Sequence, residues 1–175
     1  MAVFQDLLVE QLPHMRAFAR ALTHDRSRAD DLVQETILRA LCNVDKFEPG
    51  TNIKAWLSVI LRNQFFNELR ANSRARAYSA IPRPIGQFGD QESRLEMRDF
   101  ERAFHALPAV QREALSLVGA SGFSYQEAAI ISGCAEGTIK SRVCRARVEI
   151  ARRLGKESLV ERLDMPASAD LPMAA

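Results

Sequence analysis

Apolar residues recur every three or four positions through the first part of the chain. Two such runs lie within residues 4–8 and 15–22, and this spacing predicts amphipathic helices. Pro13 is expected in the first turn of the second helix, where a missing N–H costs least. A third helix is predicted over residues 28–42, with a capping start within Ser27-Arg-Ala-Asp30.

A turn and a long helix follow. The segment Phe47-Glu-Pro-Gly-Thr-Asn52 has Pro-Gly turn chemistry, and Thr51 or Asn52 is placed to cap a helix that runs to about Arg74. Its predicted buried face is Ile53, Leu57, Ile60, Leu61 and Phe65. Prolines and glycines from about residue 75 to 93 interrupt any period, so we expect a flexible linker between two helical domains.

The second half of the chain again has helical spacing. Helices are predicted over residues 95–106 and over residues 109–118, the latter ended by Gly119. A capping box, Ser124-Tyr-Gln-Glu127, starts the next helix, and Gly133 is placed to end it in a left-handed conformation. No stretch has convincing period-two alternation, so the predicted fold class is all-α.

The last predicted helix is basic on one side. Its apolar stripe is Ile139, Val143, Ala146, Ile150 and Leu154. From Lys140 to Arg153 there are six basic residues and one acidic residue. A short helix, a glycine-containing turn and a one-sided basic helix, in this order, are typical of a helix-turn-helix that places its second helix in the major groove.

This helix-turn-helix predicts a duplex-DNA surface. Its members are Thr138, Lys140, Ser141, Arg142, Cys144, Arg145 and Arg147. Lys140, Ser141, Cys144 and Arg145 are expected to point outward and to read base edges. Arg142 and Arg147 have a second assignment, as phosphate contacts. The alternative is a solvated helix face, which is less consistent with four independent features in the right order.

A second face of the long helix combines aromatic, amide and basic groups. It carries Trp56, Asn63, Phe66, Asn67, Arg70 and Arg74. Aromatic rings stack on unpaired bases while arginine and asparagine hold the backbone, so this face predicts single-stranded DNA binding. For Trp56 the competing interpretation, that it completes the core, stays open.

The third predicted helix has an acidic surface opposite its apolar stripe. Asp31, Gln34, Glu35 and Leu38 share this surface at spacings of three and four. An exposed leucine among acids favours a protein partner, although a solvated face is the commoner outcome.

Composition is that of a folded chain and offers no catalytic chemistry. The 175 residues include 47% hydrophobic residues and carry a net charge of +2. Three scattered cysteines predict neither disulfides nor a metal site, but rather thiols that are mostly buried. Three histidines lie apart in the sequence, and no phosphate loop or nucleophile motif is present, so we expect no enzyme and no cofactor. Neither a signal peptide nor a membrane span is evident, and a cytoplasmic location is expected.

Several of these motifs together resemble a known family. Asp30-Asp-Leu-Val-Gln-Glu-Thr36, Ala55-Trp-Leu57 and Arg62-Asn63 resemble region 2 of extracytoplasmic-function (ECF) sigma factors, and Gly137 to Arg147 resembles their region 4. The resemblance implies region 2 over residues 1–75, a linker over 76–94, region 4 over 95–155 and a tail over 156–175.

The resemblance also implies partners and sites. The acidic helix would dock on the β′ clamp of core RNA polymerase, with further contact to the β subunit. The first domain would capture the melted -10 element, and the outward basic helix would read the -35 duplex. The implied -10 residues are Phe47, Asn52, Lys54, Trp56, Arg62, Asn63, Phe66, Asn67, Arg70 and Arg74.

Within the family, Phe47 to Asn52 and Gly119 to Tyr125 are similar to the EcfG group of the alphaproteobacterial general stress response. This implies a small anti-sigma factor of the NepR type as a partner. Phe65-Phe66, Ile130-Ile131 and Glu136 depart from the group's pattern, so promoter choice is expected to differ. A ligand-sensing repressor or activator is the alternative, and such proteins usually dimerise on palindromes.

Overall fold

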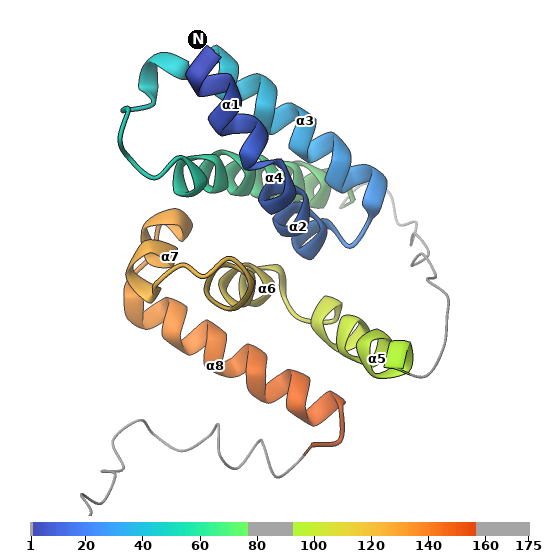
Figure 1. Cartoon of the computed structure of the whole chain (residues 1–175). Coiled ribbons are helices and arrows are strands. Elements are labelled where there is room, and N and C mark those ends of the chain that lie inside the picture. The colour runs from blue at the N-terminus through green and yellow to red at the C-terminus, as the bar shows by residue number, and fades with distance from the viewer. Residues whose placement is uncertain (1, 77–92, 157–175) are drawn as a thin grey trace, which may run out of the picture.

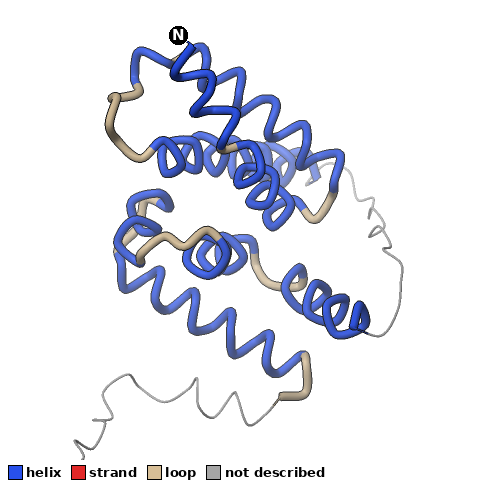
Figure 2. Tube along the Cα trace, viewed as in Figure 1, coloured by secondary structure: helices blue, strands red, loops and turns tan. Residues whose placement is uncertain are grey.

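The structure, a computed structural model, describes residues 2–76 and 93–156 of the chain. All regular secondary structure in these two ranges is helical, and neither range contains a strand (Figure 2). The all-α prediction is therefore confirmed. Most of the predicted linker and the predicted tail lie outside the described residues.

Four helices form an N-terminal bundle: α1 (Ala2–Glu10), α2 (Leu12–Thr23), α3 (Arg26–Cys42) and α4 (Ile53–Arg76). A short 3-10 turn, Val44–Lys46, precedes the loop that leads into α4. The centre of this bundle is buried and mainly apolar, with Met15, Leu22, Leu57 and Leu61 each no more than 1% exposed. The predicted apolar stripes thus meet in one core.

The helix starts only partly follow the prediction. The helix α3 begins at Arg26 and is capped by Asp25, whose carboxylate accepts the Arg28 N–H at 2.9 Å. The expected capping start within Ser27–Asp30 is wrong, because Asp25 caps two residues earlier. For α4, Asn52 Oδ1 accepts the Ala55 N–H at 3.1 Å, so Asn52 rather than Thr51 provides the cap.

The C-terminal bundle contains α5 (Ser93–His105), α6 (Ala109–Leu115), α7 (Tyr125–Ser132) and α8 (Glu136–Arg153). The helix α6 does not end at Gly119 as predicted but continues as a π-helical turn over Ser116–Ala120. Both halves of the capping box at Ser124 and Glu127 are formed, and Gly133 ends α7 with φ of 62°. The predicted helix-turn-helix is therefore α7 and α8.

The two bundles pack directly on each other. The helix α2 contacts α6, and α4 contacts α7, so that α2 and α4 form the side of the N-terminal bundle that faces the C-terminal bundle (Figure 1). A single cluster of buried apolar side chains extends from the N-terminal bundle through Leu117 and Phe123 to Ile139. The domains expected on either side of the linker are thus in contact.

Candidate functional site

The helix α8 presents its basic side to solvent. Its inward residues Ile139, Val143 and Ala146 are at most 1% exposed, Ile150 is buried, and Leu154 is half-buried. The predicted stripe is confirmed. This stripe fixes the rotation of the helix, and Lys140, Cys144 and Arg145 are consequently exposed, with Ser141 half-buried.

The exposed side chains of α8 pair mainly within the helix. Lys140 Nζ lies 2.7 Å from Glu136 Oε1, and this contact raises the pKa of Lys140. Arg145 Nη2 donates to Ser141 Oγ at 3.1 Å. Ion pairs between exposed side chains are weak and exchange readily with other partners. The outward face is therefore available to an external ligand.

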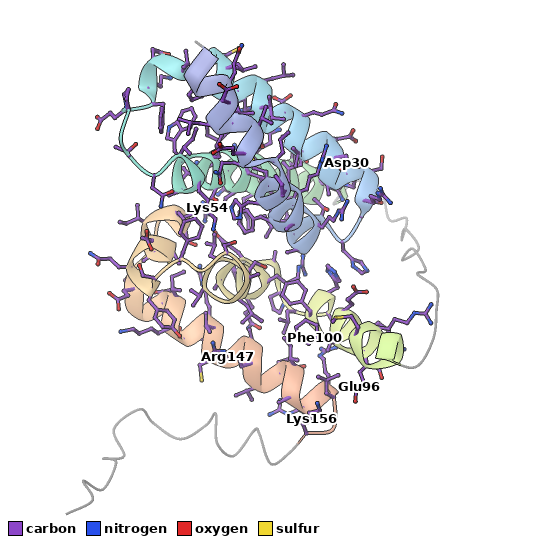
Figure 3. All side chains as sticks on the ribbon, viewed as in Figure 1. Asp30, Lys54, Glu96, Phe100, Arg147 and Lys156 are labelled. Atoms are coloured by element: carbon purple, nitrogen blue, oxygen red, sulfur yellow. The ribbon has the colours of Figure 1, made fainter. Side chains whose placement is uncertain are left out.

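The other predicted members of this surface are placed differently. Thr138 is half-buried, and its carbonyl accepts the Ser141 hydroxyl at 2.9 Å. Arg142 is also half-buried, with Nη1 3.8 Å from Cys134 Sγ. Arg147 lines a hollow of about 580 Å³ beside α5, together with Phe100 and other residues (Figure 3). Thr138 and Arg142 are thus less exposed than Lys140, Cys144 and Arg145, whereas Arg147 is exposed beside this hollow.

The aromatic side chains of the predicted -10 face lie largely in the core. Phe47 is 9% exposed, and Trp56 is half-buried with its ring 5.4 Å from that of Phe47 and 6.2 Å from that of Phe4. Trp56 also lines a hollow of about 250 Å³ with Asn63. Trp56 thus packs on the core at one side and borders an open hollow at the other.

Phe66 contradicts the expectation of an exposed aromatic residue. It is 9% exposed, packs edge-on against Phe65 at 5.1 Å, and has the Arg62 guanidinium 4.8 Å above its ring. The prediction assumed that α4 has a single buried face. Because α2, α3 and α7 all contact α4, the buried arc is wider and includes Phe66.

Two residues of α4 that are predicted to contact DNA instead contact the C-terminal bundle. The Lys54 ammonium donates to the Ser121 carbonyl and lies 4.9 Å from the Phe123 ring centre. Arg62 Nε donates to Glu113 Oε1 at 2.7 Å, with Arg62 19% exposed and Glu113 fully buried. Sequence reasoning did not single out Glu113, whose partner is 51 positions away.

The remaining polar members of this face are open to solvent. Asn52, Asn63, Asn67 and Arg70 are exposed, and Arg70 Nη1 lies 3.5 Å from Asn67 Oδ1. Arg74 lies in α4, but its side chain is outside the described part of the structure. Of the predicted -10 residues, Phe47 and Phe66 are thus buried, and Lys54 and Arg62 contact the C-terminal bundle. The others whose side chains are described are exposed or half-buried.

The acidic surface belongs to α3, a helix on the side of the N-terminal bundle away from the C-terminal bundle (Figure 1). Asp31 and Gln34 are exposed, Glu35 pairs with Arg39 at 2.9 Å, and Leu38 is 59% exposed. A leucine this exposed among polar groups is consistent with the expected protein contact.

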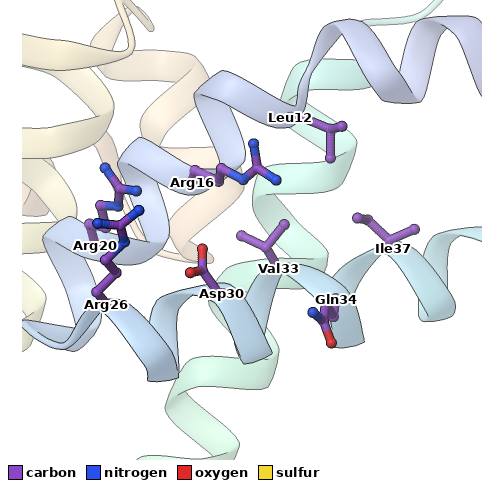
Figure 4. Close-up of a pocket in the computed structure, with 8 residues that line it drawn as sticks. All are labelled: Leu12, Arg16, Arg20, Arg26, Asp30, Val33, Gln34 and Ile37. Carbon is purple, nitrogen blue, oxygen red and sulfur yellow. The ribbon is translucent and has the colours of Figure 1, made fainter.

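Beside this surface lies an arginine-lined hollow that sequence reasoning missed. It has a volume of about 420 Å³, and Arg16 and Arg20 of α2 and Arg26 of α3 line it with Asp30 and Gln34 (Figure 4). The available signal was the spacing of four between Arg16 and Arg20, which places both on one helix face.

The histidines, which lie apart in the sequence, are placed at the contact between the bundles. The His14 ring lies 6.0 Å from that of Phe123, and the His24 and His105 rings are 3.9 Å apart. Burial, aided by Lys54, lowers the pKa of His14 to about 4. Burial, followed by His24 and Arg112, lowers the pKa of His105 to about 4, and the pKa of His24 is lowered chiefly by burial. Tertiary packing, not sequence distance, places these rings.

The cysteines form no disulfide, but Cys42 and Cys144 are exposed and Cys134 is half-buried, so the expectation of mostly buried thiols is wrong. Within residues 2–76 and 93–156, no three His, Cys, Asp or Glu side chains are grouped as a metal site requires. None of the helices described is both long enough and apolar enough to span a bilayer.

Comparisons with known proteins identify two family regions. Sigma-70 region 2 matches residues 8–75 and Sigma-70 region 4 matches residues 97–150. The chain is 49% identical to the ECF RNA polymerase sigma factor EcfG of Rhodopseudomonas palustris, over 86% of this chain and 84% of that protein. It is 32% identical to the ECF sigma factor SigM of Mycobacterium tuberculosis, over 87% of this chain and 77% of that protein.

A solved structure is similar over both bundles. The sigma factor RpoE of Bartonella quintana, in complex with the anti-sigma factor NepR, is 44% identical and superposes with a TM-score of 0.80. The match covers 89% of this chain and 98% of that one.

Proposed function

The chain belongs to the ECF family of RNA polymerase sigma factors, and from this premise we propose how its surfaces divide the work of promoter recognition. A sigma factor directs transcription initiation and is not an enzyme. The N-terminal bundle would act on the -10 element and the C-terminal bundle on the -35 element. The observation that carries this proposal is the outward basic face of α8, fixed by a buried apolar stripe.

For the -35 duplex, we assign base reading to Lys140, Ser141, Cys144 and Arg145. Their common side of α8 is exposed or half-buried, and arginine can bond guanine through two donors. Arg142, which is half-buried near Cys134, and Arg147, which is exposed beside the hollow next to α5, are assigned to phosphate contact.

For the melted -10 strand, we assign the exposed groups Asn63, Asn67 and Arg70 of α4, with Trp56 as the stacking platform. The hollow beside Trp56 and Asn63 supports a base-binding role. Lys54 and Arg62 would join them when the C-terminal bundle no longer holds these side chains. Phe47 and Phe66 would support the site from the core.

For core polymerase, we propose a docking surface of mixed charge. Leu38 supplies an apolar contact, and Asp31 and Glu35 supply acceptors for a basic partner helix. The hollow with Arg16 and Arg20 lies next to Gln34 and would take acidic groups of the same partner. Such a surface has both signs of charge, which favours one docking register.

For regulation, we propose sequestration by a small anti-sigma factor of the NepR type, in the cytoplasm, in a general stress response. The support is the likeness to the NepR-bound RpoE and to EcfG. The similarity of fold at a TM-score of 0.80 makes the same mode of capture the simplest proposal.

Co-purification with core RNA polymerase tests the docking surface. Leu38→Asp should abolish retention of the chain on immobilised core polymerase at low salt. Leu69→Asp is the matched control, because Leu69 is an exposed leucine of the same bundle, on α4. Failure of the wild-type chain to be retained, or equal loss with both variants, would contradict the assignment.

A further inference from the structure

The outward face of α8 contains a carboxylate that the proposed -35 site does not use. Glu136 is the first residue of α8, one turn before Lys140 and two turns before Cys144 along the same side of the helix. Its side chain is 45% exposed, and that of Lys140 is 58% exposed. In a helix-turn-helix, the first turns of the second helix reach base edges in the major groove. Glu136 therefore lies among the residues assigned to base reading.

The contacts of Glu136 leave it able to bind a base. Its Oε1 lies 2.7 Å from Lys140 Nζ. A carboxylate has about four acceptor positions, so a single ammonium does not occupy it, and an exposed ion pair of this kind exchanges readily. Lys140 has a second neighbour, because its Nζ lies 5.8 Å from the centre of the Tyr125 ring of α7. The ammonium thus stays in place beside Tyr125 when the carboxylate turns to a base.

An acidic side chain on this face lowers the affinity for DNA in general. Phosphates repel the Glu136 carboxylate, whereas they attract Lys140 and Arg145, the cations assigned to base reading. The repulsion is compensated only where a base edge donates a hydrogen bond to the carboxylate. Duplexes without such a donor are then rejected, which gives specificity through an unfavourable contact.

The chemistry of the base edges limits which base can compensate this carboxylate. In the major groove, hydrogen-bond donors come from the N4 amino group of cytosine and the N6 amino group of adenine, whereas guanine and thymine present acceptors. Adenine also has its N7 acceptor beside the amino group, and this atom repels the second carboxylate oxygen. Cytosine has no acceptor of its own at this edge. The Glu136 carboxylate therefore fits cytosine best, and it is opposed by the O4 acceptor of thymine.

We propose that Glu136 is a specificity-determining residue for the -35 element, and that it accepts a hydrogen bond from the amino group of one cytosine in the major groove. This rests on the proposed assignment of α8 to the -35 duplex. Lys140, one turn further along, reads a base with an acceptor at a different position. Two simpler roles are open to an acid at this place: it stabilises the positive N-terminal end of α8, or it orients Lys140.

A promoter library randomised only over the -35 element tests this proposal. It is transcribed by core RNA polymerase with the full-length wild-type chain, and a barcode in each transcript identifies the promoter from which it came. Sequencing then gives the preference for each base at each position. We expect one position at which cytosine is favoured over thymine by about tenfold, the size of one good base contact.

Two substitutions of Glu136 should change this one position in different ways. Glu136→Ala removes the acceptor, so the preference for cytosine should fall to within about twofold while the preferences at other positions persist. Glu136→Gln offers one acceptor and one donor, which match the N6 and N7 atoms of adenine, so the favoured base should change from cytosine to adenine. Glu149→Gln is the control, because it removes the same charge from the same helix, where Glu149 pairs with Arg152 and Arg153. It should leave every base preference unchanged.

The other outcomes separate base reading from the simpler roles of Glu136. A preference for cytosine that survives both substitutions would overturn the proposal. Equal changes in transcription from all promoters would reduce Glu136 to a general effect on charge or on the stability of α8. Lys140→Met keeps the stem of the side chain and removes its ammonium. If this variant and Glu136→Ala lose preference at the same single position, Glu136 only positions Lys140, and direct reading is wrong.

The same library distinguishes failure of this proposal from failure of the proposed function. A wild-type chain that selects particular -35 sequences, but favours cytosine at none of the positions, would overturn the role of Glu136 alone. A wild-type chain that gives transcripts without any base preference in the -35 element would instead contradict the assignment of α8 to that element.

Discussion

The helices α4 and α8 both carry cations assigned to DNA, but they hold them in different ways. On α8, Lys140 and Arg145 pair with neighbours one turn away on the same helix. On α4, Lys54 and Arg62 are held by a bundle that lies more than 50 positions further along the chain. The difference shows that charge on a helix face indicates a ligand surface, whereas tertiary packing decides whether that surface is available.

The largest expected effect is on the free energy of unfolding, and it distinguishes a buried ion pair from an exposed one. Arg62→Ala should lower the free energy of unfolding by about 3–5 kcal/mol, because it leaves the Glu113 carboxylate buried without its cation. Arg39→Ala removes an exposed partner of Glu35 and should cost no more than about 1 kcal/mol. Urea unfolding followed by circular dichroism measures both. Equal losses would show that the contact between the bundles does not hold Glu113.

The next largest effect is on duplex discrimination by the exposed base-reading residues of α8. Arg145→Ala should reduce discrimination between a -35 duplex and mismatched duplexes by about 1–3 kcal/mol, without changing stability. Arg153→Ala, at the far end of α8, is the control and should weaken binding to all duplexes alike. Fluorescence anisotropy at fixed salt measures both. An unchanged preference in the Arg145 variant would remove it from the reading group.

Trp56 tests the half-buried side of the -10 face. Trp56→Ala should reduce capture of unpaired bases by about 1–3 kcal/mol, whereas its effect on duplex -35 binding should be negligible. Permanganate footprinting of open complexes, in a variant shown to be folded, gives the readout. Normal opening would assign Trp56 to the core alone, with Phe4 and Phe47.

The smallest expected effect is acid sensitivity of the folded chain at the contact between the bundles. The pKa values of His14 and His105 are about 4 in the folded chain, below the ordinary value of 6.5. The unfolded chain therefore binds more protons, so stability is complete above pH 6.5 and declines as the pH falls toward 4. Lys54 and Arg112 oppose protonation at these sites, and Asp25 and Glu101 favour it at His24.

The free energy of unfolding, measured with urea, should accordingly fall between about pH 7.5 and about pH 5. His105→Phe removes one histidine of the close His24–His105 pair and should reduce this change. A pH response identical to that of the wild type would show that protonation of this histidine pair is not responsible.

The sequence predicted best the elements that are buried on one side. The stripe from Ile139 to Ile150 determined the rotation of α8, and the capping box at Ser124 fixed the start of α7, because both depend on local spacing. Phe66 was misplaced because α4 is covered on several sides. Local rules cannot reveal which residues a distant bundle will cover.

The same limit explains Glu113 and the histidines. Glu113 lies on α6, and only the fold shows that it faces Arg62 of α4. His24 and His105 are brought within 3.9 Å by the packing of the two bundles. Their positions follow from contacts between segments, for which a single sequence contains no periodic signal.

Run-off transcription with purified core RNA polymerase on a promoter library tests the central claim most directly. The account predicts transcripts above the level of core polymerase alone, only from promoters that carry both a -10 and a -35 element. Loss of Asn63 and Asn67 should impair use of the -10 element, and loss of Arg145 should impair use of the -35 element. Transcription that is no higher than with core polymerase alone, or that ignores either element, would contradict it.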